Sequence, residues 1–164
     1  MDSPEKQLAA LIAKFAPERA KEIRAVRKKM RTLLPHATEV VYDYGRSLVI
    51  SYSPNEKGYL ATFTIAAKTS GVSLYFGQGA KTLPDPTRRL SGNAKVVRSM
   101  PIEGAATLDE EDVRALMNIA IERATVPFDP KAKHQLIIQS GSKAKTKTKT
   151  KTKTKAKARN KRGR

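Results

Sequence analysis

The first 35 residues place hydrophobic and polar positions at the spacing of α-helices. The apolar side chains of the first stretch recur at i, i+3, i+4 and i+7: Leu8, Leu11, Ile12 and Phe15. They share one helix face. Ser3 can cap this helix, and Pro4 suits its first turn. Pro17 then begins a second helix, which should run to about Leu34 because Pro35 cannot continue it.

The predicted second helix has two contrasting faces. Its apolar positions are Ile23, Val26, Met30 and Leu33. The cations of another face, about 120° wide at 100° per residue, are Lys21, Arg24, Arg27, Lys28 and Arg31. We predict that Lys21, Arg24, Lys28 and Arg31 support contact with a phosphate backbone. A basic stripe of this kind also occurs as an ordinary solvated helix face.

From Glu39 to Ile102 the hydrophobic period changes to two, which is typical of β-strands. Four alternating segments stand out: Val40-Tyr42-Tyr44, Leu48-Ile50-Tyr52, Tyr59-Ala61-Phe63-Ile65 and Val72-Leu74-Phe76. Short turn-rich connections separate them, so consecutive strands should be antiparallel neighbours. A longer loop leads to a last strand near residues 95–102. The pattern predicts an antiparallel meander of about five strands.

A final helix follows the sheet, and a capping box at Thr107–Glu110 should begin it. Its buried positions are Val113, Leu116, Met117, Ala120 and Ile121. Pro127 ends it, and Gln135–Ser140 can add a short edge strand. We therefore predict a two-layer α+β fold, in which the N-terminal helix pair and the C-terminal helix pack on one face of the sheet.

Charge divides the 164-residue chain into two parts. The formal net charge is +18, from 33 Lys and Arg against 15 Asp and Glu. The last 22 residues contain twelve cations and no acid: Lys143, Lys145, Lys147, Lys149, Lys151, Lys153, Lys155, Lys157, Arg159, Lys161, Arg162 and Arg164. This segment has no apolar side chain larger than Ala to bury, so we expect it to be disordered. The predicted organisation is a folded domain (1–126), a linker with the short edge strand (127–141) and a basic tail (142–164).

The tail carries most of the functional inference. Twelve cations without an acid should attract any polyanion. The tail has no Leu, Phe or Trp to insert into a bilayer, which favours nucleic acid over a membrane. No element resembles a base-reading motif, so we expect binding without sequence preference and without catalysis. A solubility tail is the simpler alternative.

A second candidate site lies in the predicted loop and the strand after it. Its cations, which could form a small anion pocket near Gly92, are Lys81, Arg88, Lys95 and Arg98. Scattered surface charge is the competing interpretation. A small-molecule anion-binding domain, or a weak enzyme with a pocket between sheet and helices, is accordingly the alternative function.

Other candidate chemistry is sparse. The chain has no Cys, which excludes disulfides and thiolate chemistry, and its two histidines, His36 and His134, lie in unrelated segments. The acids Asp109–Asp112 suit a helix N-terminus better than a metal site. Five tyrosines (Tyr42, Tyr44, Tyr52, Tyr59 and Tyr75) could stack on bases, but packing beneath the helices is favoured. We expect no metal or other cofactor, no membrane association and a cytoplasmic location, and leave the oligomeric state open.

Several turn and strand motifs together resemble a known family. They are Val72–Gly77, Gly79-Ala80, Leu83-Pro84-Asp85-Pro86 and Leu90–Arg98. With the paired helices before them and the helix after them, they are similar to the YdhG-like family of small bacterial domains of unknown function, over roughly residues 5–125. The resemblance implies a two-layer α+β fold and brings no established catalytic residues.

Overall fold

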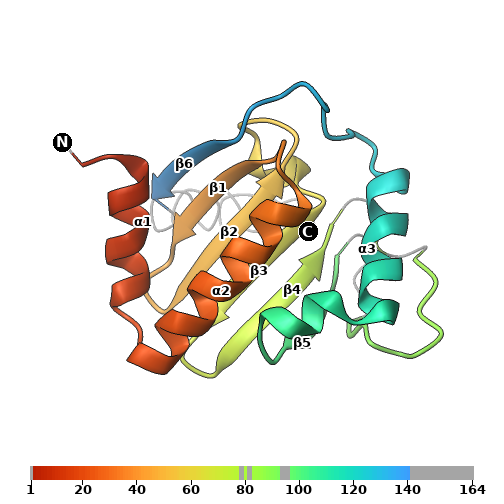
Figure 1. Cartoon of the computed structure of the whole chain (residues 1–164), viewed down its shortest axis with the longest axis horizontal. Coiled ribbons are helices and arrows are strands. Elements are labelled where there is room, and N and C mark those ends of the chain that lie inside the picture. The colour runs from red at the N-terminus through yellow and green to blue at the C-terminus, as the bar shows by residue number, and fades with distance from the viewer. Residues whose placement is uncertain (1, 78–79, 81–82, 93–96, 141–164) are drawn as a thin grey trace, which may run out of the picture.

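The fold is a six-stranded mixed sheet with helices packed against it (Figure 1). The computed structural model describes residues 2–77, 80, 83–92 and 97–140. The strand order is β5-β4-β3-β2-β1-β6. The strands are β1 (Thr38–Asp43), β2 (Ser47–Ser53), β3 (Phe63–Lys68), β4 (Gly71–Phe76), β5 (Arg98–Ile102) and β6 (Gln135–Ser140). The predicted α+β class is confirmed.

Strands β1 to β5 form the predicted antiparallel meander, each paired with the next. The sixth strand corrects the expected number of about five. β6 pairs in parallel with β1, from Thr38 opposite Gln135 to Asp43 opposite Ser140. A parallel neighbour requires a long crossover connection, and the α3 segment supplies it. The sheet is therefore mixed, and its sixth strand is the edge strand that the sequence predicts at Gln135–Ser140.

Helices α1 (Pro4–Ala13) and α2 (Pro17–Leu33) begin where predicted, and α2 ends next to the expected Leu34, whereas α1 ends before Phe15 of the predicted stripe. Ser3 caps α1 by accepting a hydrogen bond from the Lys6 amide at 3.3 Å. Helix α3 (Glu111–Arg123) begins later than the capping box predicts. Residues Ala105–Asp109 form the 3₁₀ helix η3 instead, and the Thr107 hydroxyl accepts from the Glu103 amide rather than capping a helix.

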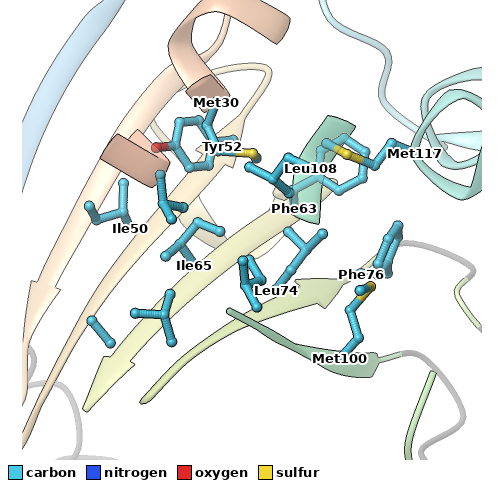
Figure 2. Close-up of a cluster of buried hydrophobic side chains, with 14 of the residues drawn as sticks. Met30, Ile50, Tyr52, Phe63, Ile65, Leu74, Phe76, Met100, Leu108 and Met117 are labelled. Carbon is cyan, nitrogen blue, oxygen red and sulfur yellow. The ribbon is translucent and has the colours of Figure 1, made fainter. Parts of the chain in front are cut away.

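One hydrophobic core lies between the helices and one face of the sheet. Figure 2 shows Met30 of α2 beside Tyr52, Ile50 and Ile65 of the sheet, while Leu108 of η3 and Met117 of α3 approach Phe63. All of these side chains are buried. Phe63 and Phe76 meet edge to face, with ring centroids 5.4 Å apart. The alternation in β3 and β4 thus points its large residues at the helices, as predicted.

Strand β1 departs from the predicted orientation. Its register places Glu39 beside Tyr52 and Val41 beside Ile50, on the helix-facing side of the sheet. Val40, which the alternation grouped with Tyr42, lies on the other face yet is also buried. The connection after β2 contributes there: Gly58, in the 3₁₀ helix η1 (Gly58–Leu60), lies against the Tyr42 hydroxyl. The expected start of β3 at Tyr59 is also wrong, because Tyr59 belongs to η1 and β3 begins at Phe63.

Candidate functional site: a basic cavity beside helix α2

The cations predicted on the second helix do share an exposed surface of α2. Arg24, Lys28 and Arg31 follow at i, i+4 and i+7, and all three are exposed, as is Lys21. Neither Arg24 nor Lys28 forms an ion pair with any residue in the described part of the chain. Because the apolar side of α2 is held by Ile23, Val26 and Met30 in the core, the helix cannot turn this stripe inward.

The stripe forms one wall of an open cavity of about 360 Å³, here called the basic cavity. Its lining residues come from α1, from α2 and its C-terminal end, and from the segment before β6: Ile12, Arg24, Arg27, Lys28, Arg31, Thr32, Pro35 and His134. Parts of the chain more than 100 residues apart thus meet here. The parallel pairing of β6 with β1 brings His134 to this position.

Arg27 binds two carboxylates at the floor of the cavity. Its Nε and Nη2 donate to Oε2 and Oε1 of Glu39 at 3.0 and 2.8 Å. Its Nη1 and Nη2 donate to Glu5 of α1, both at 3.0 Å. Burial opposes the charge of Arg27, but these hydrogen bonds outweigh it and raise the pKa of the guanidinium. The same bonds lower the pKa of Glu5.

Glu39 is fully buried, which is rare for a carboxylate unless it is paired. Besides Arg27, it accepts a hydrogen bond from Nε2 of His134 at 2.8 Å. Tyr52 lies beside it in the sheet, and its buried hydroxyl has no hydrogen-bond partner among the described residues. Burial, followed by the charge of Glu39, raises the pKa of Tyr52 well above its usual value.

The hydrogen bonds of His134 define its tautomer. Arg31 Nη2 lies 3.3 Å from Nδ1 of His134. A guanidinium can only donate, so Nδ1 accepts and the ring proton is on Nε2, which donates to Glu39. His134 is neutral in this arrangement. Arg31 itself lies 3.8 Å from Glu5 and 4.0 Å from Glu39, too far for strong hydrogen bonds to either.

The charges at the basic cavity do not cancel. Four cations line it, and two carboxylates, Glu5 and Glu39, contact them. With His134 neutral, the formal charge of this group is +2. Arg27 is already bound on both sides, so the excess resides on Arg24, Lys28 and Arg31. This arrangement can bind an anion.

The second predicted site, in the loop before β5, has a different structure. Lys81 and Lys95 lie outside the described residues. Arg98 lies 3.6 Å from Asp85, and Arg88 occupies a turn with φ of 54°. Gly92 has a φ of 104°, which favours glycine, and nothing lies within 4 Å of the position that a Cβ atom would take. An anion pocket at Lys81, Arg88, Lys95 and Arg98 remains a prediction.

The acids at the start of α3 are paired with cations. Arg89 contacts Asp112 at 2.7 Å and Glu110 at 3.0 Å. Asp109 contacts Lys29 and Arg114 at 2.8 and 2.7 Å. These hydrogen bonds lower the pKa values of Asp109 and Asp112 and raise that of Arg89. Among the described residues, no group of three or more His, Asp or Glu side chains could hold a metal ion.

The remaining candidates divide between the core, the surface and the undescribed tail. Only Tyr52 of the five tyrosines packs in the core; Tyr44 and Tyr59 are exposed, and Tyr44 stacks on Tyr42 with ring centroids 6.1 Å apart. The twelve tail cations between 143 and 164 lie outside the described residues. Within the described part, none of the helices is long and apolar enough to span a membrane.

Sequence reasoning did not identify Glu39, Glu5 or His134 as parts of a site. The one available signal for Glu39 was a carboxylate inside a β-branched strand, Thr38-Glu39-Val40-Val41. No comparable signal linked His134 to it, because their contact depends on where β6 joins the sheet.

Comparisons with known proteins supply no further assignment. No family model matches the chain, and no match is found among curated proteins or solved structures. The resemblance to the YdhG-like family therefore stays a prediction.

Proposed function

We propose that this protein binds nucleic acid through its phosphates, without catalysis and without strong sequence preference. The α2 stripe of Lys21, Arg24, Lys28 and Arg31 is the contact surface of the folded part, and the cations of residues 142–164 add further contacts. The observation that carries the proposal is that Arg24 and Lys28 are exposed side by side with no acidic partner in the described structure, while neighbouring Arg27 is neutralised.

Charge placement favours phosphate contact over base reading. Side chains that bind phosphates fix a protein on a duplex but carry no direct sequence information. Unpaired lysines and arginines release counterions from the nucleic acid when they bind, and the affinity then depends steeply on salt. Six to ten simultaneous contacts would weaken duplex binding roughly 10³- to 10⁵-fold between 50 and 200 mM salt.

The first test measures duplex DNA affinity of the full chain across a salt series. The variant Arg24→Gln/Lys28→Gln removes two exposed cations of the stripe. The matched control, Arg46→Gln/Lys57→Gln, removes two exposed cations elsewhere. The slope of log K against log salt should become shallower by about 1.8 in the stripe variant and should not change in the control. Equal slopes for both variants would remove α2 from the proposed interface.

A second comparison uses a chain that ends at residue 141. This chain lacks the phosphate contacts of the tail, so its slope of log K against log salt should be shallower than that of the full chain. Its melting temperature should stay within a few degrees of that of the full chain. Repeating the salt series of both chains on an unrelated duplex tests specificity. Strong preference for one duplex, or full retention of binding without the tail, would contradict the proposal.

The basic cavity also favours the alternative, a small-anion binding domain. A volume of about 360 Å³ lies at the low end for small-molecule pockets. What such a ligand would be follows from the charges and shape of the cavity.

A further inference from the structure

We infer that the basic cavity is a binding site for a terminal phosphate group, that is, a phosphate monoester of the nucleotide class. The inference rests on the proposed function, because it specifies which phosphate the α2 surface takes. Arg24, Lys28 and Arg31 bind the phosphate oxygens. Arg27 is a positioning residue, fixed by Glu39 and Glu5.

The charge of the cavity favours a terminal phosphate monoester over a phosphodiester of a nucleic acid backbone. Its cations and carboxylates leave a formal excess of +2. A phosphate monoester carries about −1.5 to −2 at neutral pH, whereas each diester in a nucleic acid backbone carries one charge. A terminal monoester therefore matches the excess and leaves no large unpaired charge.

Arg31 has free donors where the ligand would lie. A guanidinium has five N–H donors, and the only hydrogen bond of the Arg31 side chain within the described structure is the one to His134 Nδ1. Its distances of 3.8 and 4.0 Å to Glu5 and Glu39 leave the remaining donors without a hydrogen bond to either carboxylate. Charge-assisted bonds from arginine to phosphate are the strong kind.

The Arg27–Glu39 pair holds the wall of the cavity in place. Glu39 is in β1, Glu5 in α1 and Arg27 in α2, so one guanidinium joins three elements. The fully buried Glu39 prevents Arg27 from turning outward, since its departure would leave a buried charge unpaired. The adjacent cations are thereby presented from a fixed helix, which reduces the ordering cost of binding.

The cavity also has room for an organic group. Ile12 and Pro35 line it beside the cations, which gives an apolar surface next to the phosphate position. The volume of about 360 Å³ exceeds the roughly 30 Å³ share of one liquid water molecule more than tenfold. Sulfate-sized anions alone would leave most of it filled with water.

The test is calorimetric titration of the full chain at physiological salt with adenosine 5′-monophosphate, adenosine and inorganic phosphate. We expect saturable binding of the monophosphate, weaker binding of inorganic phosphate and none of adenosine. Arg24→Gln/Lys28→Gln should weaken monophosphate binding about 10-fold or more, as expected for lost charge-assisted bonds. Arg46→Gln/Lys57→Gln should not, although both variants keep every tail cation. Equal affinity for adenosine, or equal loss in both variants, would overturn the inference.

Two oligonucleotides then identify the source of the phosphate. A single strand with a 5′-phosphate is compared with the same strand bearing a 5′-hydroxyl. Tighter binding of the phosphorylated strand, abolished by Arg24→Gln/Lys28→Gln, assigns the cavity to strand ends; binding of the free monophosphate alone assigns it to nucleotides. If neither occurs while duplex binding keeps its α2-dependent salt slope, this inference fails and the proposed function stands.

Discussion

Two groups of arginines differ in how their charges are balanced. In the basic cavity, two carboxylates, Glu5 and Glu39, contact a group of four cations, and the formal excess of +2 lies with Arg24, Lys28 and Arg31. In the second group, here called the loop cluster, Arg89 is paired with Glu110 and Asp112, and Arg98 with Asp85. Both regions look equally basic in a local stretch of sequence. The difference teaches that acids from other segments determine how much charge a basic cluster retains.

The largest expected effect is on the free energy of unfolding, and it distinguishes the buried Arg27–Glu39 pair from the more exposed Arg27–Glu5 pair. Glu39→Gln should lower the free energy of unfolding by about 3 kcal/mol, the lower end of the range for breaking a buried ion pair, because Arg27 keeps Glu5. Glu5→Gln removes the other carboxylate of Arg27, but this one is half-exposed, so the loss should stay below about 1 kcal/mol. Urea denaturation of the full chain measures both. Equal losses would show that the burial of Glu39 does not set the strength of this network.

A smaller effect concerns acid stability in the loop cluster. Hydrogen bonds from Arg89 and Thr87 hold the pKa of Asp112 below its usual value. A carboxyl with a lowered folded-state pKa contributes stability above its unfolded pKa of about 4, and this is lost as the pH falls through the folded value. Asp112→Asn should therefore make the decline of stability below pH 4 less steep and leave the profile near pH 7 flat.

The control for this profile is Glu111→Gln, which changes a neighbouring exposed acid. Denaturation midpoints between pH 2.5 and 7 should follow the unmodified chain in the control. If stability falls equally steeply below pH 4 in all three proteins, the Arg89–Asp112 pair does not contribute to stability.

Much of the fold follows from periodicity. The starts of α1 and α2, the order of the four meander strands and most of the buried stripe of α3 could be predicted, because each pattern of side chains is typical of one local geometry. The later start of α3 could not. Thr107 and Glu110 fit a capping box, but the Thr107 hydroxyl accepts from the Glu103 amide and the Glu110 carboxylate contacts Arg89.

The candidate site was predictable only on its helical side. The spacing of Arg24, Lys28 and Arg31 showed a shared face, because all three belong to one helix. Hydrophobic patterning could not show that Glu39 is buried, since it assigns a carboxylate to the solvent face of a strand. The contact between Glu39 and His134 spans 95 residues and exists only because β6 pairs in parallel beside β1.

One measurement compares the basic cavity and the loop cluster directly. The full chain is titrated with inorganic phosphate at constant ionic strength, and NMR monitors its backbone amide and arginine Nε–H resonances. If unbalanced charge decides where an anion binds, saturable shifts among residues 2–140 will be confined to residues 24–32 and the Nε–H group of Arg31. The resonances of Arg89 and Arg98, already engaged by Asp112 and Asp85, will not move. Saturable shifts centred on Arg88–Arg98, with α2 unaffected, would contradict this.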